Sequence, residues 1–233
     1  MKIVKQSWEW NRIPDGMQIL RDIEKAGRTC YKSEDKITED SAKEFVSKMI
    51  KSGHHAMIEF GIVPPVKIIT DRGVTHEIVR HRLFSFAQES TRYCNYSKNK
   101  FGNEITIIQP VWITDEEMNI YNKIISEKVG NVISLDDIPA SLVGSFFWIN
   151  SMKESEYNYL KLIEKGWSAQ QARSVLPNSL KTEINISGNV REWRHFFNLR
   201  CSPKAHPQMQ DIAKSMLIGF KKDIPVIFDD IIN

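Results

Sequence analysis

Residues 139–165 carry the longest regular pattern of the sequence, and a long amphipathic helix accounts for it. Six apolar side chains recur there at helical spacing: Leu142, Phe146, Ile149, Tyr157, Leu160 and Ile163. This spacing places them on one face of a helix. Gly166 follows at a position where helices commonly end. The chain must therefore supply a hydrophobic core against which one face of this helix packs.

Shorter patterns predict that helices dominate the rest of the chain. Helical periodicity is found at residues 15–26, 39–51, 73–79, 114–129, 169–175, 191–199 and 208–221. Strand-like runs lie at residues 62–69, 105–109 and 181–187. Because these strands do not alternate regularly with helices, the predicted fold class is α+β rather than doubly wound α/β. No linker interrupts the sequence, so residues 1–233 are expected to form a single domain.

The charge balance argues against a general binder of nucleic acid or membrane surfaces. Lysine and arginine number 32 against 29 acidic residues, a formal net charge of +3. No run approaches the roughly 18 apolar residues that a membrane span needs. The three cysteines are widely separated and show no metal or disulfide pattern, which predicts a reducing, cytoplasmic setting. Any recognition of anions must come from local clusters of cations.

Several common catalytic motifs are absent. No two glycines are spaced as GxG, which excludes the dinucleotide-binding fingerprint and the P-loop. His76 and His81 are five residues apart, about 140° around a helix, so they do not form a zinc helix, and no metal site is predicted. Ser90 is not in a GxSxG turn. Cys94 and Cys201 have no motif around them and are expected to be buried, unreactive thiols.

The densest group of reactive side chains is the segment RHRLFSFAQESTRY at residues 80–93. Its 14 positions hold three arginines, a histidine, two serines, a threonine and a tyrosine. Guanidinium groups bind phosphate oxygens in pairs, and hydroxyl groups can complete the shell. A solvated helix end that complements the helix dipole is the alternative. The run Ser90-Thr91-Arg92 favours an anion site, because solvation alone gives no reason to group these residues.

A second basic cluster lies late in the chain. Arg173 precedes Pro177, where a helix should stop. Steps of three and four relate Arg191 to Arg194 and His195 on the next helix. The same pattern also fits a core helix with ordinary surface arginines.

The sequence resembles the flavin-dependent thymidylate synthases. Arg80-His81-Arg82, seven residues and Ser90 match the RHR-x7-S signature of that family, and Arg92-Tyr93 continue it. The similarity spans residues 51–210 and includes the segments SGHHAMIE, ARSVLP, GNVREWRHFFNLR and AHPQ. It implies a homotetramer of α+β subunits, each with a central, mostly antiparallel sheet packed with long helices. Active sites would lie at the subunit interfaces.

The resemblance also implies the reaction. A methyltransferase of this family makes dTMP from dUMP, takes the methylene from 5,10-methylenetetrahydrofolate and reduces it with FAD that NADPH replenishes. Neither nucleic acid nor a membrane is an expected partner. The implied catalytic residue is Arg200, which would activate the uracil base. The implied dUMP set is Glu77, Arg80, Gln88, Glu89, Ser90, Thr91, Arg92, Arg173 and Arg200. The implied FAD set is His54, Ala56, Arg80, His81, Arg82, Gln88, Asn189, Arg191 and His195.

Four positions differ from the residues that the family often carries. Gln88 stands in place of glutamate, Glu77 of glutamine, Ala56 of a hydroxyl residue and His195 of asparagine. Two other functions remain open at this point. One is a non-catalytic protein that binds nucleotides or single-stranded nucleic acid through the same basic clusters. The other keeps the fold and the flavin but acts on another uracil-containing substrate.

Overall fold

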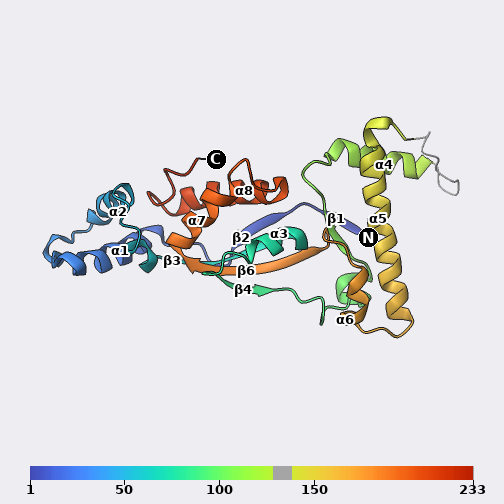
Figure 1. Ribbon diagram of the computed structural model, residues 1–233, viewed down its shortest axis with the longest axis horizontal. Coiled ribbons are helices and arrows are strands. Elements are labelled where there is room, and N and C mark those ends of the chain that lie inside the picture. The colour runs from blue at the N-terminus through green and yellow to red at the C-terminus, as the bar shows by residue number, and fades with distance from the viewer. Residues whose placement is uncertain (128–137, 233) are drawn as a thin grey trace. The chain divides into compact units, whose positions relative to one another are not determined.

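The structure is a computed structural model that describes residues 1–127 and 138–232 (Figure 1). Its strands are β1 (Lys2–Val4), β2 (Ser7–Trp10), β3 (Ile62–Asp71), β4 (Ser85–Gln88), β5 (Thr106–Ile108) and β6 (Lys181–Asn189). Its helices are α1 (Gly16–Tyr31), α2 (Ser41–Lys51), α3 (Arg72–Ile78), α4 (Asp115–Glu127), α5 (Val143–Glu164), α6 (Ala169–Ala172), α7 (Val190–Arg200) and α8 (Pro207–Asp223). Short 3-10 turns are η1 (Glu34–Lys36), η2 (Met57–Phe60), η3 (Asn99–Phe101), η5 (Ala140–Leu142) and η6 (Arg173–Val175). The predicted α+β class is confirmed.

Two sheets are present in the described residues. Strands β2, β3, β6 and β4 lie next to one another in that order, and the pairs β2–β3 and β4–β6 are antiparallel. Strands β1 and β5 form a separate parallel pair. Strands β1 and β2 were not predicted, because three- and four-residue strands are too short to show a clear alternation. Strand β4, within the segment of residues 80–93, pairs with β6 over its full length.

The chain divides into two compact units, and each unit is made of three separate stretches. Unit 1 comprises residues 1–5, 71–73 and 89–182, and unit 2 comprises residues 6–70, 74–88 and 183–233. No single cut of the chain separates them, because the chain passes between the units five times. The single domain expected from the sequence stays a prediction.

The core of unit 2 is aromatic, and helix α7 supplies much of it. Trp193, Phe196 and Phe197 are fully buried at helical spacing. The ring of Trp193 lies 4.8 Å from that of Phe220 on α8 and 4.5 Å from that of Phe84. Helix α8 packs against both α7 and β2 (Figure 1). One face of α7 is thus fixed in the core, which leaves its other positions for polar contacts.

In unit 1 the long helix predicted at 139–165 is α5, preceded by the turn η5. It ends before Gly166, whose φ of +90° suits glycine best. The prediction was wrong about Tyr157, which is 61% exposed, whereas Tyr159 is buried. The buried face instead runs through Ile149, Met152 and Tyr159.

Glu156 falls on the same side of α5 and has two partners in unit 1. Its carboxylate accepts a hydrogen bond from the backbone N–H of Ile105 at 3.0 Å and lies 3.0 Å from the amino terminus of Met1. A carboxylate with such partners can lie beside a core without a large desolvation penalty. The apolar pattern alone gave no sign of this contact.

The remaining predicted elements agree with the structure to within a few residues at their ends. The expected helix at 114–129 is α4 as far as Glu127, and residues 128 and 129 lie outside the described residues. The segment 169–175 is helix α6 followed by the turn η6. Within the described ranges, no helix combines the length and apolarity that crossing a bilayer requires.

Gly188 permits a close approach that can be tested. A Cβ at this position in β6 would lie 2.2 Å from the ring of Phe84, which is itself packed on Trp193. We expect Gly188→Ala to lower the free energy of unfolding by about 1–3 kcal/mol, because the ring has no room to move.

Gly144 is the matched control, because a Cβ there meets nothing within 4 Å. Gly144→Ala should leave the free energy of unfolding unchanged or raise it by up to about 1 kcal/mol, since alanine is the better helix former. Urea unfolding of both variants measures the difference. Equal stability of the two would contradict the role given to Gly188.

Candidate functional site

The segment after α3 makes two turns, which bury one of its basic side chains and leave two others exposed. The backbone N–H of His81 donates to the carbonyl of Ile78, and that of Phe84 donates to the carbonyl of His81. Phe84 is buried in the core of unit 2 and anchors the turns. His81 therefore points inward and is only 4% exposed, whereas Arg80 and Arg82 on either side are exposed.

Arg200, the last residue of α7, meets two of the other predicted site residues. Its Nε donates to Nε2 of His81 at 3.0 Å. One terminal nitrogen donates to the carboxylate of Glu77 at 2.6 Å, and the other donates to the Glu77 carbonyl at 3.0 Å. The structure thus brings together Glu77, His81 and Arg200, although Arg200 is 123 residues from Glu77 in the chain.

The hydrogen-bonding capacity of Arg200 is only partly used by these contacts. A guanidinium carries five N–H donors, and the three bonds to Glu77 and His81 engage one donor on each nitrogen. The two terminal nitrogens each keep one N–H. The side chain is 14% exposed, so the cation is held in place and still reachable. Such a fixed cation can stabilise negative charge that develops on a bound ligand.

His81 is neutral in this environment. Burial is the main reason why its pKa falls from 6.5 to about 4, and the positive charge of Arg200 adds to the effect. Nε2 accepts from Arg200, so the imidazole proton belongs on Nδ1. The carboxylate of Glu192 lies 3.4 Å from Nδ1, and burial raises the pKa of Glu192.

The side chains of His81, Glu192 and His195 also meet the spacing of a divalent cation site. Their potential ligand atoms all lie within 4.8 Å of one another. The guanidinium of Arg200 is bonded directly to His81, and its charge opposes a second cation there. The arrangement therefore suits a chain of hydrogen bonds better than a metal centre.

The predicted FAD residues all belong to unit 2, and four of them line two different cavities. His54 and Ala56 line a cavity of about 180 Å³, together with Met57. Arg191 and His195 line another of about 230 Å³. Both volumes fall below the roughly 300–1,000 Å³ of typical small-molecule pockets. Neither cavity by itself encloses a dinucleotide.

Three polar residues of α7 and its N-cap have structural partners. Asn189 is the N-cap of α7, and its side-chain oxygen accepts from the backbone N–H of Glu192 at 3.0 Å. Arg191 pairs with Glu59 at the surface. Arg194, part of the basic cluster seen in the sequence, makes a two-pronged ion pair with Asp230 at 2.6 Å. It holds the C-terminal segment, which sequence reasoning did not anticipate.

In unit 1 the structure brings Thr91 and Arg173 together. The guanidinium of Arg173 donates to the hydroxyl of Thr91 at 3.3 Å. The hydroxyl of Ser90 accepts from the backbone N–H of Arg92 at 3.3 Å, which stabilises the turn. Arg92 itself is exposed and lies over the ring of Tyr93. Two guanidinium groups and two hydroxyls of unit 1 thus come from residues predicted to bind a phosphate ester.

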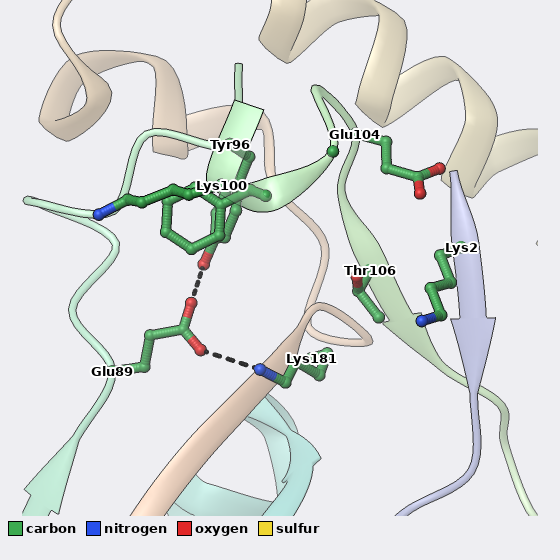
Figure 2. Close-up of a pocket in the computed structure, with 9 residues that line it drawn as sticks. Lys2, Glu89, Tyr96, Lys100, Glu104, Thr106 and Lys181 are labelled. Atoms are coloured by element: carbon green, nitrogen blue, oxygen red, sulfur yellow. Dashed lines mark hydrogen bonds and ion pairs between the residues drawn. The ribbon is translucent and has the colours of Figure 1, made fainter. Parts of the chain in front are cut away.

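Glu89 is already engaged by partners that were not predicted. Figure 2 shows its carboxylate between the hydroxyl of Tyr96, at 2.8 Å, and the ammonium of Lys181, at 3.4 Å. These residues line a cavity of about 350 Å³ in unit 1. Burial and the adjacent Glu89 raise the pKa of Tyr96. Glu89 therefore ties its own segment to Tyr96 and β6, and the side chain of Gln88 donates to Thr75 at 2.9 Å in unit 2.

Cys94 and Cys201 match the expectation of unreactive thiols, although only Cys201 is fully buried. Cys201 is buried, and burial raises the pKa of its thiol to about 11. Burial also raises the pKa of Cys94, which is half-buried. Both thiols stay protonated at neutral pH and are poor nucleophiles.

The sequence of the chain matches one protein-family model and is similar to those of known proteins. The model of the Thy1 family, described as thymidylate synthase complementing protein, matches residues 15–226. A flavin-dependent thymidylate synthase of Corynebacterium aurimucosum is 30% identical over 210 residues, which cover 89% of this chain and 78% of that protein. Another, of Mycolicibacterium gilvum, is 30% identical and covers 95% and 82%.

One solved structure has a similar fold. It is a UMP/dUMP methylase, PolB of Streptomyces cacaoi, bound with 5-Br UMP. The TM-score is 0.70 with 19% identity, and the match covers 98% of this chain and 95% of that one. At this identity the likeness concerns the fold.

The lowered pKa of His81 predicts a pH-dependent stability. In the unfolded chain His81 titrates near 6.5, so acid protonates the unfolded state first and favours it. We expect the free energy of unfolding to fall by roughly 3 kcal/mol through His81 between pH 7 and pH 4. Urea unfolding at several pH values measures the loss. His81→Gln should show a shallower dependence, and parallel curves would contradict the prediction.

Proposed function

The chain belongs to the Thy1 family of thymidylate synthase complementing proteins, and we propose that it is a flavin-dependent thymidylate synthase that methylates dUMP to dTMP. The observation that carries this proposal is the cluster in which Arg200 is fixed by Glu77 and His81. The cluster joins the RHR segment to the end of α7, the two segments on which the resemblance depends. The relatives named above share about 30% of their residues with the chain.

In this proposal Arg200 is the catalytic residue that activates the base. The two N–H groups left on its terminal nitrogens donate to the polar edge of the uracil. A positive charge held there favours the ionised base, which raises the electron density at C5 and makes C5 a better nucleophile. Fixed donors of this kind are typically worth about 2.7–4 kcal/mol of barrier. Glu77 and His81 keep the guanidinium from turning, so the side chain loses little conformational entropy when substrate binds.

The phosphate and sugar of dUMP are assigned to the remaining predicted residues. Arg92 and Arg173 supply guanidinium groups, and Ser90 and Thr91 supply hydroxyls. The pairing of Arg173 with Thr91 and the exposure of Arg92 support this assignment. The full proposed set is Glu77, Arg80, Gln88, Glu89, Ser90, Thr91, Arg92, Arg173 and Arg200. Within it, Glu89 acts by holding its neighbour Ser90, because both of its oxygens already have partners.

The residues predicted for FAD fit an anionic, partly aromatic group. Arg80 and Arg82 are exposed and have no ion-pair partner within residues 1–127 and 138–232. Such cations suit the two phosphates of a dinucleotide. When bound, FAD would supply the hydride that reduces the methylene carbon, with NADPH and 5,10-methylenetetrahydrofolate as co-substrates. The proposed set is His54, Ala56, Arg80, His81, Arg82, Gln88, Asn189, Arg191 and His195, in which Asn189 acts by capping α7.

We also propose that the protein works as a homotetramer in the cytoplasm, with active sites at subunit interfaces. Leu83 and Tyr93, both in the segment that carries the signature, are 76% and 79% exposed. Exposed apolar side chains next to a binding segment are typical of surfaces that associate. The small cavities of unit 2 support the same conclusion, because a second subunit would enlarge them. The fold of 1–233 would then act as one domain within the assembly.

The first test is a visible absorption spectrum of the purified protein. We expect a yellow protein whose flavin bands bleach with NADPH and that releases the C5 hydrogen of dUMP once 5,10-methylenetetrahydrofolate is added. UMP serves as the competing substrate and should react more slowly, because a site shaped around the deoxyribose edge disfavours an added hydroxyl. A protein that stays colourless after incubation with FAD would refute the proposal. Salt-sensitive binding to single-stranded nucleic acid would instead favour the non-catalytic alternative.

The two arginines should differ in what they do. Arg200→Ala should keep the flavin spectrum and lower kcat about 100- to 1,000-fold, because it removes donors that act on the developing charge. Arg92→Ala should mainly raise KM for dUMP. Arg21→Ala, an exposed change on α1, is the control and should leave both constants unchanged. If Arg200→Ala turns over at the rate of the control, the activating role is wrong.

A further inference from the structure

We propose that Glu192 is a positioning residue that holds the imidazole of His81 in one tautomer, and thereby fixes the guanidinium of Arg200. The inference rests on the proposed function for its effect on catalysis, although its structural part does not. Glu192 belongs to neither set of residues predicted from the sequence. It lies in the first turn of α7, eight residues before Arg200.

The hydrogen bond between Arg200 and His81 determines where the imidazole proton must be. Arginine is always protonated in proteins, so its Nε can only donate. Nε2 of His81, 3.0 Å away, must therefore accept with a free lone pair. In a neutral imidazole the proton is then on Nδ1. The other tautomer would place two donors against each other and break the contact.

Nδ1 is buried, and the carboxylate of Glu192 faces it. The side chain of His81 is 2% exposed and that of Glu192 is 7% exposed. An oxygen of Glu192 lies 3.4 Å from Nδ1, and Nδ1 has no closer hydrogen-bond partner among the described residues. A buried donor left without an acceptor destabilises the folded state. A small movement of the carboxylate toward Nδ1–H satisfies both groups.

Neighbouring residues of α7 and its N-cap restrain both the ring of His81 and the helical turn that carries Glu192. The ring of His81 packs on Phe196, 5.1 Å away, and on His195, 5.4 Å away, both from the middle of α7. Asn189 caps the helix by accepting from the backbone N–H of Glu192, which fixes the turn that carries the carboxylate. The contact survives protonation of Glu192, because the carbonyl oxygen of a neutral carboxyl group still accepts a hydrogen bond.

Loss of the acceptor at position 192 removes the preference for the Nδ1–H tautomer. His81 then also populates the Nε2–H form, and Arg200 loses one of its three restraints. In metal sites, removal of the carboxylate that orients a histidine ligand typically lowers function about 10- to 100-fold, and we expect a loss of similar size here. The effect should fall on kcat more than on KM, because the guanidinium remains but is less well oriented.

The experiment compares Glu192→Leu, which removes the acceptor, with Glu192→Gln, which keeps a carbonyl oxygen at the same place. The full-length protein is labelled with 15N-histidine, and His81→Gln identifies the His81 signals. We expect the Nδ1–H tautomer in the unmodified protein and in Glu192→Gln. Glu192→Leu should show a mixture and a 10- to 100-fold lower kcat for dUMP. Glu192→Gln should recover most of that loss.

An Nε2–H tautomer in the unmodified protein would overturn the proposal, whether or not Glu192→Leu folds. A Glu192→Leu protein with the Nδ1–H tautomer and undiminished kcat would also overturn it. The tautomer measurement needs no substrate. An unmodified protein that shows the expected tautomers but makes no dTMP would thus support the positioning and count against the proposed function alone.

Discussion

The site depends on how one partly buried cation is held. Arg200 is 14% exposed, and the carboxylate of Glu77 balances its charge. A neutral His81 accepts a hydrogen bond from its Nε. Removal of Glu77 would leave the mostly buried charge of Arg200 without its ion-pair partner, which is destabilising. The contact therefore ties the end of α3 and the turn after it to the end of α7. A guanidinium restrained at all three nitrogens pays its orientation entropy during folding rather than when a ligand arrives.

The aromatic core makes this restraint possible. Trp193 and Phe197 bury one side of α7, and Phe84 packs its ring against Trp193 and the backbone of Gly188. The helix and the turn that carries His81 are thus fixed by the same set of rings. The polar side chains at the remaining positions of α7 are therefore attached to a backbone that the core holds in place. On this one helix, the apolar residues that pack in the core recur at a spacing of three or four residues, and the polar residues of the site lie between them in the chain.

The sequence predicted the helices well, because apolar periodicity shows that one face of a helix is buried, whichever residues it packs against. It missed β1 and β2, which are too short to show a pattern, and it placed Tyr157 of α5 on the wrong face. The resemblance placed Glu77 and Arg200 in one predicted set and His81 in another, and the structure brings the three side chains together. It did not anticipate that Glu89 would bind Tyr96 and Lys181, or that Arg194 would bind Asp230. Contacts between residues far apart in the chain leave no local signal.

The sequence alone determined the fold class, the family and the residues proposed to bind a nucleotide, because motifs and periodicity are local properties. Only the tertiary structure decided which of these groups are already occupied and which remain available to a ligand. Asn189 is used as a helix cap, whereas Arg200 keeps two free donors. The burial of Glu192 against His81 was likewise decided by packing. The reason is physical: burial and hydrogen-bond partners are set by side chains that fold together from distant parts of the chain.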